Sequence, residues 1–248
     1  MTDEWDSYFA NVNNELASLF VDLGIRESVP DPLRPHLTWC WVYMNQPRPD
    51  GLSSGDEAPM LGTIEDDLLG ALKERTAFVG RITAAGRREF YFYSDDATRC
   101  EDTISRTMRK HATYRFDLGS KRDKPWSQYL DLLYPSPEEF QRIKNRRVVE
   151  VLKQQGDQLA KARPVSHWAY FATPRDRNSF LAEVTRRGFT IADRSTDAGE
   201  PSSHRYGVTL EKVDSIEHID DVTIELFRLA RMHDGEYDGW ETAVEKTP

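Results

Sequence analysis

The sequence lacks several features that mark particular classes of protein. Its 248 residues include only two cysteines, Cys40 and Cys100, which are too few for a disulfide scaffold. No run of about 18 apolar residues occurs, which excludes a membrane-spanning helix. The first residues are acidic, whereas a secretory signal needs a basic flank and an apolar core. These absences predict a soluble cytoplasmic protein from a reducing compartment.

Most sequence signatures of catalysis and cofactor binding are also missing. The chain has no G-x-S-x-G elbow, no phosphate-binding G-x-x-x-x-G-K-[ST] loop and no G-x-G-x-x-G turn. Zinc sites need clustered cysteines and histidines, but His36 and Cys40 have no second pair near them in the sequence. His167 shares its side of a predicted strand with apolar residues, which is typical of a structural histidine. We therefore expect no enzyme activity, no metal and no other cofactor.

Positive charge is the third feature in short supply. The chain has 33 Lys and Arg residues against 42 Asp and Glu residues, which gives a formal net charge of −9. Electrostatic binding to a phosphate backbone requires the opposite sign. Residues 87–93 are aromatic, as in RNA-binding sheets, but they lack the glycine and aromatic pattern of such proteins. We predict no direct nucleic-acid binding, whereas an acidic surface suits docking onto a basic protein.

The chain does contain enough aromatic residues, 11 Phe, 10 Tyr and 6 Trp, to build folded cores. Residues 37–44 alternate along a strand with two largely apolar sides, which predicts a central strand covered on both faces. The first 135 residues then read as β-α-β-β-α-β, with a strand before this run. The expected elements are strands 5–12 and 37–44, a helix near 64–72, strands 76–84 and 87–94 joined at Ala85-Gly86, a helix at 97–111 and a strand at 113–118.

A helix is expected between two such units. Ser136 can cap this helix, Pro137 suits its first turn, and Glu139 completes a capping box. After it, the same order of elements is expected again: strand 165–172, a helix capped by Thr173, strand 189–194, strand 206–213, helix 216–233 and strand 240–245. The fold class predicted is α+β, with two ferredoxin-like antiparallel sandwich domains at 1–135 and 161–248 and a helical connector at 136–160.

Two groups of residues are candidates for contact with a partner. The stretch 234–241 is interpreted as a helix-to-strand turn with Tyr237 and Trp240 packed on the sheet, or as a contact surface as well. A helical wheel places Ile224 on the polar side of helix 216–233, where it could act as an apolar anchor. The predicted partner-binding residues are Asp221, Ile224, Glu225, Asp234, Glu236, Tyr237, Asp238 and Trp240. Trp168 and Tyr170, on one side of strand 165–172, are predicted to contact the other domain or a second subunit.

The C-terminal residues resemble a known family. The helix from Ile219-Asp220 to Leu229-Ala230, followed by Tyr237-Asp238-Gly239-Trp240, resembles the RraB family, regulators of ribonuclease E activity. The resemblance covers roughly residues 163–245. It implies a ferredoxin-like domain that binds ribonuclease E and inhibits RNA cleavage without catalysis of its own. The N-terminal region, with its Trp39-Cys40-Trp41 strand, is similar to a bacterial family of unknown function that is often fused to an RraB-like partner.

Three functions remain open at this point. The first is a non-catalytic protein-binding regulator, with a ribonuclease E-type enzyme as the candidate partner. The second is a module that binds a small molecule or peptide on an open sheet face, which a deep concave pocket would support. The third is an enzyme of unrecognised type, which requires a cleft where side chains of perturbed pKa converge. The sequence favours the first, with no membrane partner, and leaves the oligomeric state open.

Overall fold

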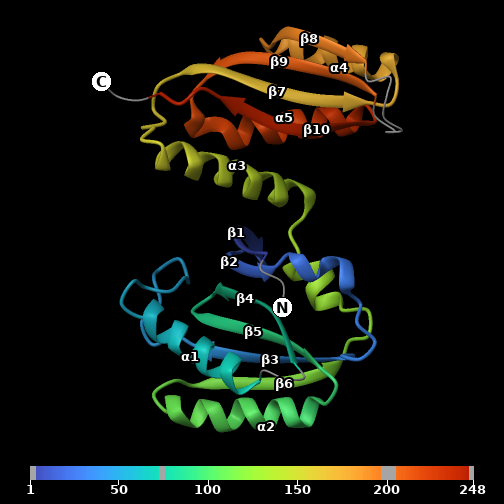
Figure 1. Cartoon of the computed structure of the whole chain (residues 1–248). Coiled ribbons are helices and arrows are strands. Elements are labelled where there is room, and N and C mark those ends of the chain that lie inside the picture. Colours follow the sequence, from blue (N-terminus) through green and yellow to red (C-terminus); the bar gives the residue numbers. More distant parts are fainter. Residues whose placement is uncertain (1–3, 73–75, 197–204, 246–248) are drawn as a thin grey trace. The chain divides into compact units, whose positions relative to one another are not determined.

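The computed structural model of the chain describes residues 4–72, 76–196 and 205–245 (Figure 1). The chain divides into two compact units, the N-terminal unit (1–139) and the C-terminal unit (140–248). The boundary lies in the first turn of helix α3 (Pro137–Gln154). Each unit combines one antiparallel sheet with helices, so the predicted α+β class is confirmed. No helix in the described ranges is long and apolar enough to cross a membrane.

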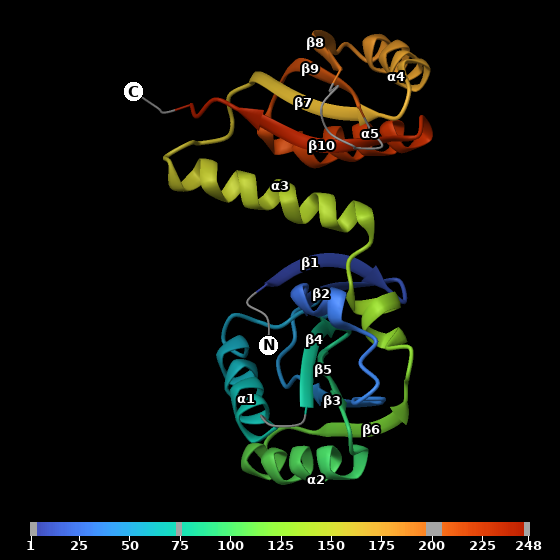
Figure 2. The ribbon, with the colours of Figure 1, turned by 45° about the vertical axis from the view of Figure 1, so that its right-hand side comes forward.

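The N-terminal unit contains a six-stranded sheet in the order β1-β2-β4-β5-β3-β6. Its elements are β1 (Trp5–Val12), β2 (Glu15–Asp22), β3 (His36–Tyr43), α1 (Ala58–Ala71), β4 (Thr76–Ala84), β5 (Arg87–Ser94), α2 (Ala97–Met108) and β6 (Phe116–Arg122). From β3 onward this is the predicted β-α-β-β-α-β order (Figure 2). The sequence analysis missed β2, which pairs with β1 through a tight turn. Asn13 and Asn14 form that turn with φ angles of 53° and 67°, which asparagine tolerates better than most residues.

The two faces of this sheet differ. Cys40, Val42, Phe90 and Phe92 form a buried core with residues of α1 and α2. The opposite face is covered only in part, by the β1–β2 hairpin and by a short π-helix (Gln128–Leu133). On the second face of β3, Leu37 is buried and Trp39 and Trp41 are partly buried.

The C-terminal unit contains a four-stranded sheet in the order β10-β7-β9-β8. Helices α4 and α5 pack on one face of it (Figure 1). The elements are β7 (Arg163–Phe171), α4 (Pro174–Arg186), β8 (Thr190–Thr196), β9 (Tyr206–Asp214), α5 (Ile219–Met232) and β10 (Gly235–Thr242). Thr173 caps α4 as predicted, because its side chain accepts a hydrogen bond from the backbone N–H of Asp176 at 3.2 Å. The last strand begins at Gly235 and not at Trp240, so the predicted turn is largely strand.

Candidate protein-docking face

The side chains of the Tyr-Asp-Gly-Trp segment, residues 237–240, point to both faces of the sheet at β10. Tyr237 and Trp240 are 6% and 7% exposed and belong to the buried clusters on the helix side of the sheet. A bulge between Tyr237 and Gly239 adds Asp238 to the strand and leaves it exposed. The two aromatic rings therefore contact the protein's own core, which removes them from the surface predicted to bind a partner.

Trp240 is held by an amide in α3. Its indole N–H donates a hydrogen bond of 2.9 Å to Asn145 Oδ1, which also accepts from Gln141 Nε2 at 3.1 Å. Asn145 Nδ2 donates to Asp220 Oδ1 at 2.7 Å and to Thr223 Oγ1 at 2.6 Å. Every hydrogen-bonding position of this buried amide is therefore occupied, and it joins α3 to α5 and β10.

We expect Trp240→Phe to lower the free energy of unfolding of the C-terminal unit by about 1–3 kcal/mol. The substitution keeps an aromatic ring but removes a buried donor from Asn145. Urea unfolding of the full chain, followed through the indole N–H signal of Trp168, measures the change. The control is Trp168→Phe, followed through Trp240, because Trp168 is half-buried and makes no comparable hydrogen bond. Equal losses in the two variants would contradict the role given to Asn145.

The structure corrects the position of Ile224. This side chain is 3% exposed, so the prediction of an exposed apolar anchor on α5 is wrong. The helical wheel assumed one buried side facing the sheet. In the structure α5 is also bonded to α3 through Asp220 and Thr223, which adds a second covered side.

The predicted acidic residues do not form one patch. Asp221 and Glu225 lie on the exposed side of α5, away from the sheet, and Glu225 Oε1 accepts a hydrogen bond from Arg187 Nε at 2.7 Å. Asp234 lies in the turn between α5 and β10. Glu236 pairs with Tyr170 in the sheet, on the face that α4 and α5 do not cover. The acids of the helix and of the strand thus point to opposite sides of the unit.

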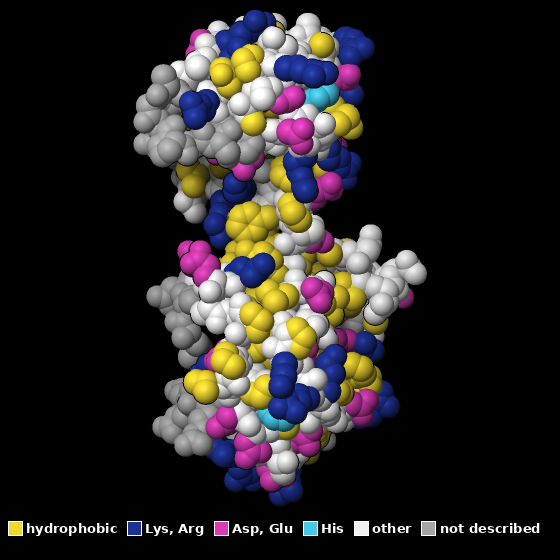
Figure 3. Space-filling model, turned by 90° about the vertical axis from the view of Figure 1, so that its right-hand side faces the viewer, with side chains coloured by type: hydrophobic (Ala, Val, Ile, Leu, Met, Phe, Trp, Pro, Cys, Tyr) yellow, Lys and Arg dark blue, Asp and Glu magenta, His cyan; other side chains and the backbone are white. Residues whose placement is uncertain are grey.

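The uncovered side of the sheet gathers a different set of residues. The register of the four strands places aromatic rings near its centre and carboxylates around them. We call this the open face and define it by Trp168, Tyr170, Asp193, Glu211, Glu236 and Glu241. Among the described strand positions on this side there is no Lys or Arg. On the side of this unit drawn in Figure 3, by contrast, basic and acidic side chains are mixed.

The two aromatic residues of the open face lie beside glycines of the neighbouring strands. Tyr170 pairs with Gly207, and a Cβ on that glycine would be 3.1 Å from Tyr170 Cε1. The absence of a side chain at Gly207 therefore lets the phenol ring lie across β9. Trp168 lies between Thr209 and Gly239 of the two adjacent strands. Both aromatic residues are half-buried, and their contact with another domain or subunit stays a prediction.

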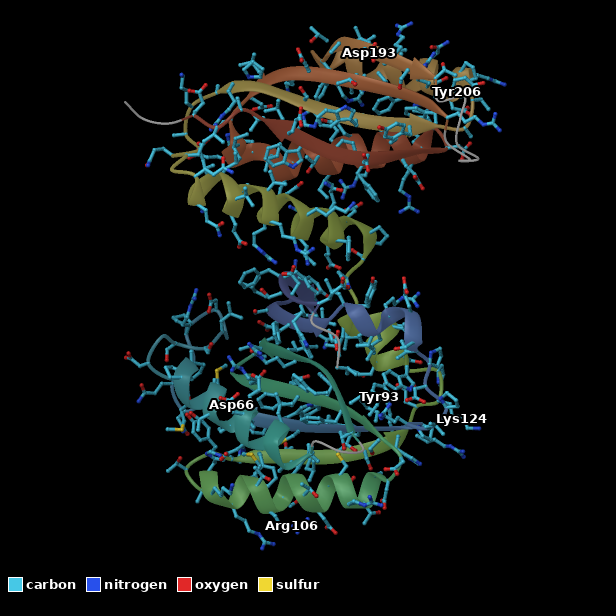
Figure 4. The ribbon with its side chains drawn as sticks, in the orientation of Figure 1. Asp66, Tyr93, Arg106, Lys124, Asp193 and Tyr206 are labelled. Carbon is cyan, nitrogen blue, oxygen red and sulfur yellow. The ribbon has the colours of Figure 1, made fainter. Side chains whose placement is uncertain are left out.

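Asp193, Glu211 and Glu241 were missed by the sequence analysis. Figure 4 labels Asp193, which lies on β8, the edge strand of the sheet. Each of these acids lies at an outward strand position, and for Asp193 this position depends on a bulge between Ile191 and Asp193 that breaks the alternation of β8. Which strands are neighbours is not readable from the sequence, because the pairing of β7 with β9 and β10 joins residues 35 (Phe171 and Tyr206) to 77 (Val165 and Thr242) positions apart.

Both resemblances named in the sequence analysis are confirmed by family comparisons. A family of unknown function, DUF695, matches residues 3–134, which is more than half of the chain. The chain belongs to this family. Beyond the DUF695 region, residues 142–242 match the family described as "Regulator of ribonuclease activity B". This second match begins inside α3 and includes Asn145 together with the whole sheet of the C-terminal unit.

Comparisons with individual proteins add little to the DUF695 assignment. No curated protein matches the chain. A solved structure of a "putative glycine cleavage system transcriptional repressor" is 13% identical, over 84% of this chain and 98% of its own, with a TM-score of 0.26. An unknown protein from Galdieria sulphuraria is 10% identical, over 85% and 99%, with a TM-score of 0.24. Scores this low carry no inference for either unit.

Proposed function

We propose that the protein is a non-catalytic regulator whose C-terminal unit binds a basic segment of a ribonuclease E-type enzyme on the open face and lowers its RNA cleavage. The family match of residues 142–242 supports the class of regulator. The observation that carries the choice of surface is the placement of Trp168 and Tyr170 among four carboxylates on the side without helices.

The chemistry of the open face favours an arginine-rich or lysine-rich partner segment. Cations bind the faces of tryptophan and tyrosine rings through the charge distribution of the π-system. Asp193, Glu211, Glu236 and Glu241 surround these rings and attract the same cations. A sheet face that helices leave uncovered can bind an extended segment along its strands. Opposite charges also speed association, so binding should weaken as salt increases.

A non-catalytic role of the open face is supported by the position of His167 and Tyr237, two groups with perturbed pKa values. Burial lowers the pKa of His167 to about 4 and raises the pKa of Tyr237 well above its usual value. His167 Nδ1 and the Tyr237 hydroxyl lie 2.9 Å apart and form a hydrogen bond inside the core. Neither group faces the open face. Among the described residues, no group of three or more His, Cys, Asp or Glu side chains is placed to hold a metal ion.

The test is a binding and RNA-cleavage assay with a purified ribonuclease E-type enzyme. We expect Trp168→Ala to weaken binding about tenfold or more, because aromatic anchors dominate the energy of interfaces. Glu211→Lys should weaken binding about three- to tenfold, with a larger loss at low salt. RNA cleavage should recover in parallel in both variants. Circular dichroism melts of the variants show whether each remains folded.

Asp221→Lys is the matched control, because it reverses an exposed charge on α5 and leaves the open face unchanged. We expect it to bind like the wild type within about twofold. If Asp221→Lys weakens binding as much as Glu211→Lys, the docking surface is on the helix side. If the wild-type protein neither binds nor inhibits the nuclease at micromolar concentration, the proposed function is wrong.

A further inference from the structure

The face of the N-terminal sheet opposite α1 and α2 is hollowed into a cavity of about 500 Å³. Its walls come from β3, β4, β5 and β6 and from the short π-helix, and the tip of the β1–β2 hairpin reaches its rim. Pockets that bind small organic molecules are typically about 300–1,000 Å³. None of the residues that line it belongs to the open face of the C-terminal unit.

Two indole rings form an apolar wall of this cavity. Trp39 and Trp41 are neighbours on the same side of β3, with ring centroids 6.4 Å apart and planes tilted by 36°. Trp39 pairs with Gly119 of β6, and a Cβ on that glycine would lie 2.5 Å from Trp39 Cζ2. The indole therefore lies flat over the bare backbone of Gly119. Leu37 and Ile82, both buried, continue the apolar lining.

A set of polar contacts fixes the residues at one side of the wall. The Arg87 guanidinium lies over the Trp41 ring, 4.5 Å from its centroid, and its Nε donates a hydrogen bond of 2.5 Å to Glu89 Oε1. The Tyr91 hydroxyl donates to Glu89 Oε2. Both oxygens of the buried Glu89 carboxylate are therefore occupied, and its charge is compensated by Arg87. These contacts hold Arg87 in place before any ligand arrives.

Positive charge is left over at both ends of the cavity, because Arg87 pairs with Tyr43 at one end of β3 and Lys121 pairs with Leu37 at the other. The terminal nitrogens of Arg87 make no hydrogen bond to the described part of the chain. Lys121 also lines the cavity and forms no ion pair with a described residue. Glu15, the other acid of the lining besides Glu89, lies exposed at the hairpin tip. A ligand in contact with the indoles thus meets two available cations and a carboxylate that is already neutralised.

We propose that this cavity is a binding site for a small organic carboxylate with a flat apolar body. The body would contact Trp39 and Trp41, and the carboxylate would accept hydrogen bonds from the Arg87 guanidinium, while the Lys121 ammonium at the other end of β3 would add electrostatic attraction without a hydrogen bond. The proposal concerns the N-terminal unit alone. It is independent of whether the C-terminal unit binds a ribonuclease.

Three probes of one shape and different charge test the proposal: 2-naphthoate, the neutral 2-naphthamide and cationic 2-naphthylmethylammonium. Each is titrated into the full chain, and the indole N–H signals of the six tryptophans are followed by NMR. We expect 2-naphthoate to shift the signals of Trp39 and Trp41 and to leave those of Trp168 and Trp240 unchanged. Its affinity should exceed that of 2-naphthamide by about tenfold, and the cation should bind more weakly still.

Two lysines provide a matched pair of variants. Lys121 lines the cavity, whereas Lys124 lies just beyond the end of β6 and does not line it (Figure 4). Both are exposed, so neither substitution is expected to disturb folding. Lys121→Gln should weaken 2-naphthoate binding about two- to threefold and leave 2-naphthamide unchanged, whereas Lys124→Gln should change neither. Arg87→Gln should reduce 2-naphthoate binding about tenfold or more.

Several results would overturn the proposal. The first is the absence of any shift in Trp39 and Trp41 at millimolar 2-naphthoate. The second is equal affinity for 2-naphthoate and 2-naphthamide, which would remove the carboxylate from the assignment. The third is an equal effect of Lys121→Gln and Lys124→Gln, which would mean that the anion is attracted by general charge and not by this cavity.

Discussion

Asp157→Asn is expected to lower the free energy of unfolding of the C-terminal unit by about 3–5 kcal/mol. The side chains of Asp157 and Arg163 are 0% and 2% exposed, and Arg163 Nη1 and Nη2 donate to the two carboxylate oxygens. The backbone N–H groups of Leu159 and Glu245 donate to the same carboxylate, at 2.7 and 2.8 Å. These contacts join the end of α3, the start of β7 and the segment after β10. An asparagine would leave the Arg163 charge buried without its counter-charge.

Urea unfolding of the full chain measures this loss, with the indole signals of Trp168 and Trp240 as reporters. The Trp126 signal reports the N-terminal unit and should be unchanged. The control is Glu245→Gln, which makes the same carboxylate-to-amide change in an exposed pair with Lys161 and should cost less than about 1 kcal/mol. Replacing both members, as in Asp157→Leu with Arg163→Met, should cost less than Asp157→Asn alone. Equal losses for Asp157→Asn and Glu245→Gln would contradict the prediction.

Features encoded by neighbouring residues could be predicted from the sequence. The reciprocal capping box at Ser136 and Glu139 is present, with distances of 2.7 and 3.3 Å. The hairpin turn at Ala85-Gly86 is also confirmed, with φ angles of 49° and 74°. Each of these structures is decided within four residues, by a side chain that caps a helix or by a glycine that tolerates positive φ. The β-α-β-β-α-β order follows from the same kind of local signal.

Features that depend on distant contacts could not be predicted. Ile224 was placed on a polar surface because a helical wheel contains no information about α3. The flat setting of Trp39 requires Gly119, and that of Tyr170 requires Gly207, which are far along the chain in each case. Trp39 and Trp41 therefore read as buried strand residues, although they line a cavity. The sequence shows which residues alternate along a strand, but the order of strands in the sheet determines which residues each face of the strand contacts.

The stability of the C-terminal unit is expected to fall by about 3 kcal/mol as the pH drops from 7 towards 4, because His167 is buried in its neutral form. Burial is the main cause that lowers its pKa from 6.5 to about 4, while the charge of Asp214 raises this pKa and that of Lys212 lowers it. Each unit of pKa difference corresponds to about 1.4 kcal/mol. Nδ1 bonds to the Tyr237 hydroxyl, and Nε2 is buried without a hydrogen-bond partner in the described structure.

The direction of the effect follows from proton binding. Between pH 6.5 and 4 the imidazole is protonated in the unfolded chain but not in the folded unit, so the unfolded state binds more protons. The contribution of His167 to the free energy of unfolding is therefore fully present above about pH 6.5, decreases between pH 6.5 and 4, and changes no further below pH 4. Asp157 acts in a different range, because hydrogen bonds from Arg163 lower its pKa and its contribution is lost only in stronger acid.

His167→Gln separates this effect from the general titration of the surface. Glutamine can still form a hydrogen bond with Tyr237, but it replaces a packed ring in the core, so the variant should be less stable than the wild type at pH 7. Because glutamine is uncharged at all these pH values, the free energy of unfolding of the variant should change little between pH 4.5 and 7. Urea midpoints of both proteins, read from the Trp240 indole signal at half-unit intervals of pH, measure the two curves. The matched control is His218→Gln, since His218 is exposed at the start of α5 and should leave the wild-type slope intact. If the wild-type curve runs parallel to that of His167→Gln, the buried imidazole is not the group that titrates. Only a group that the variant lacks can cause a difference in slope between the two curves.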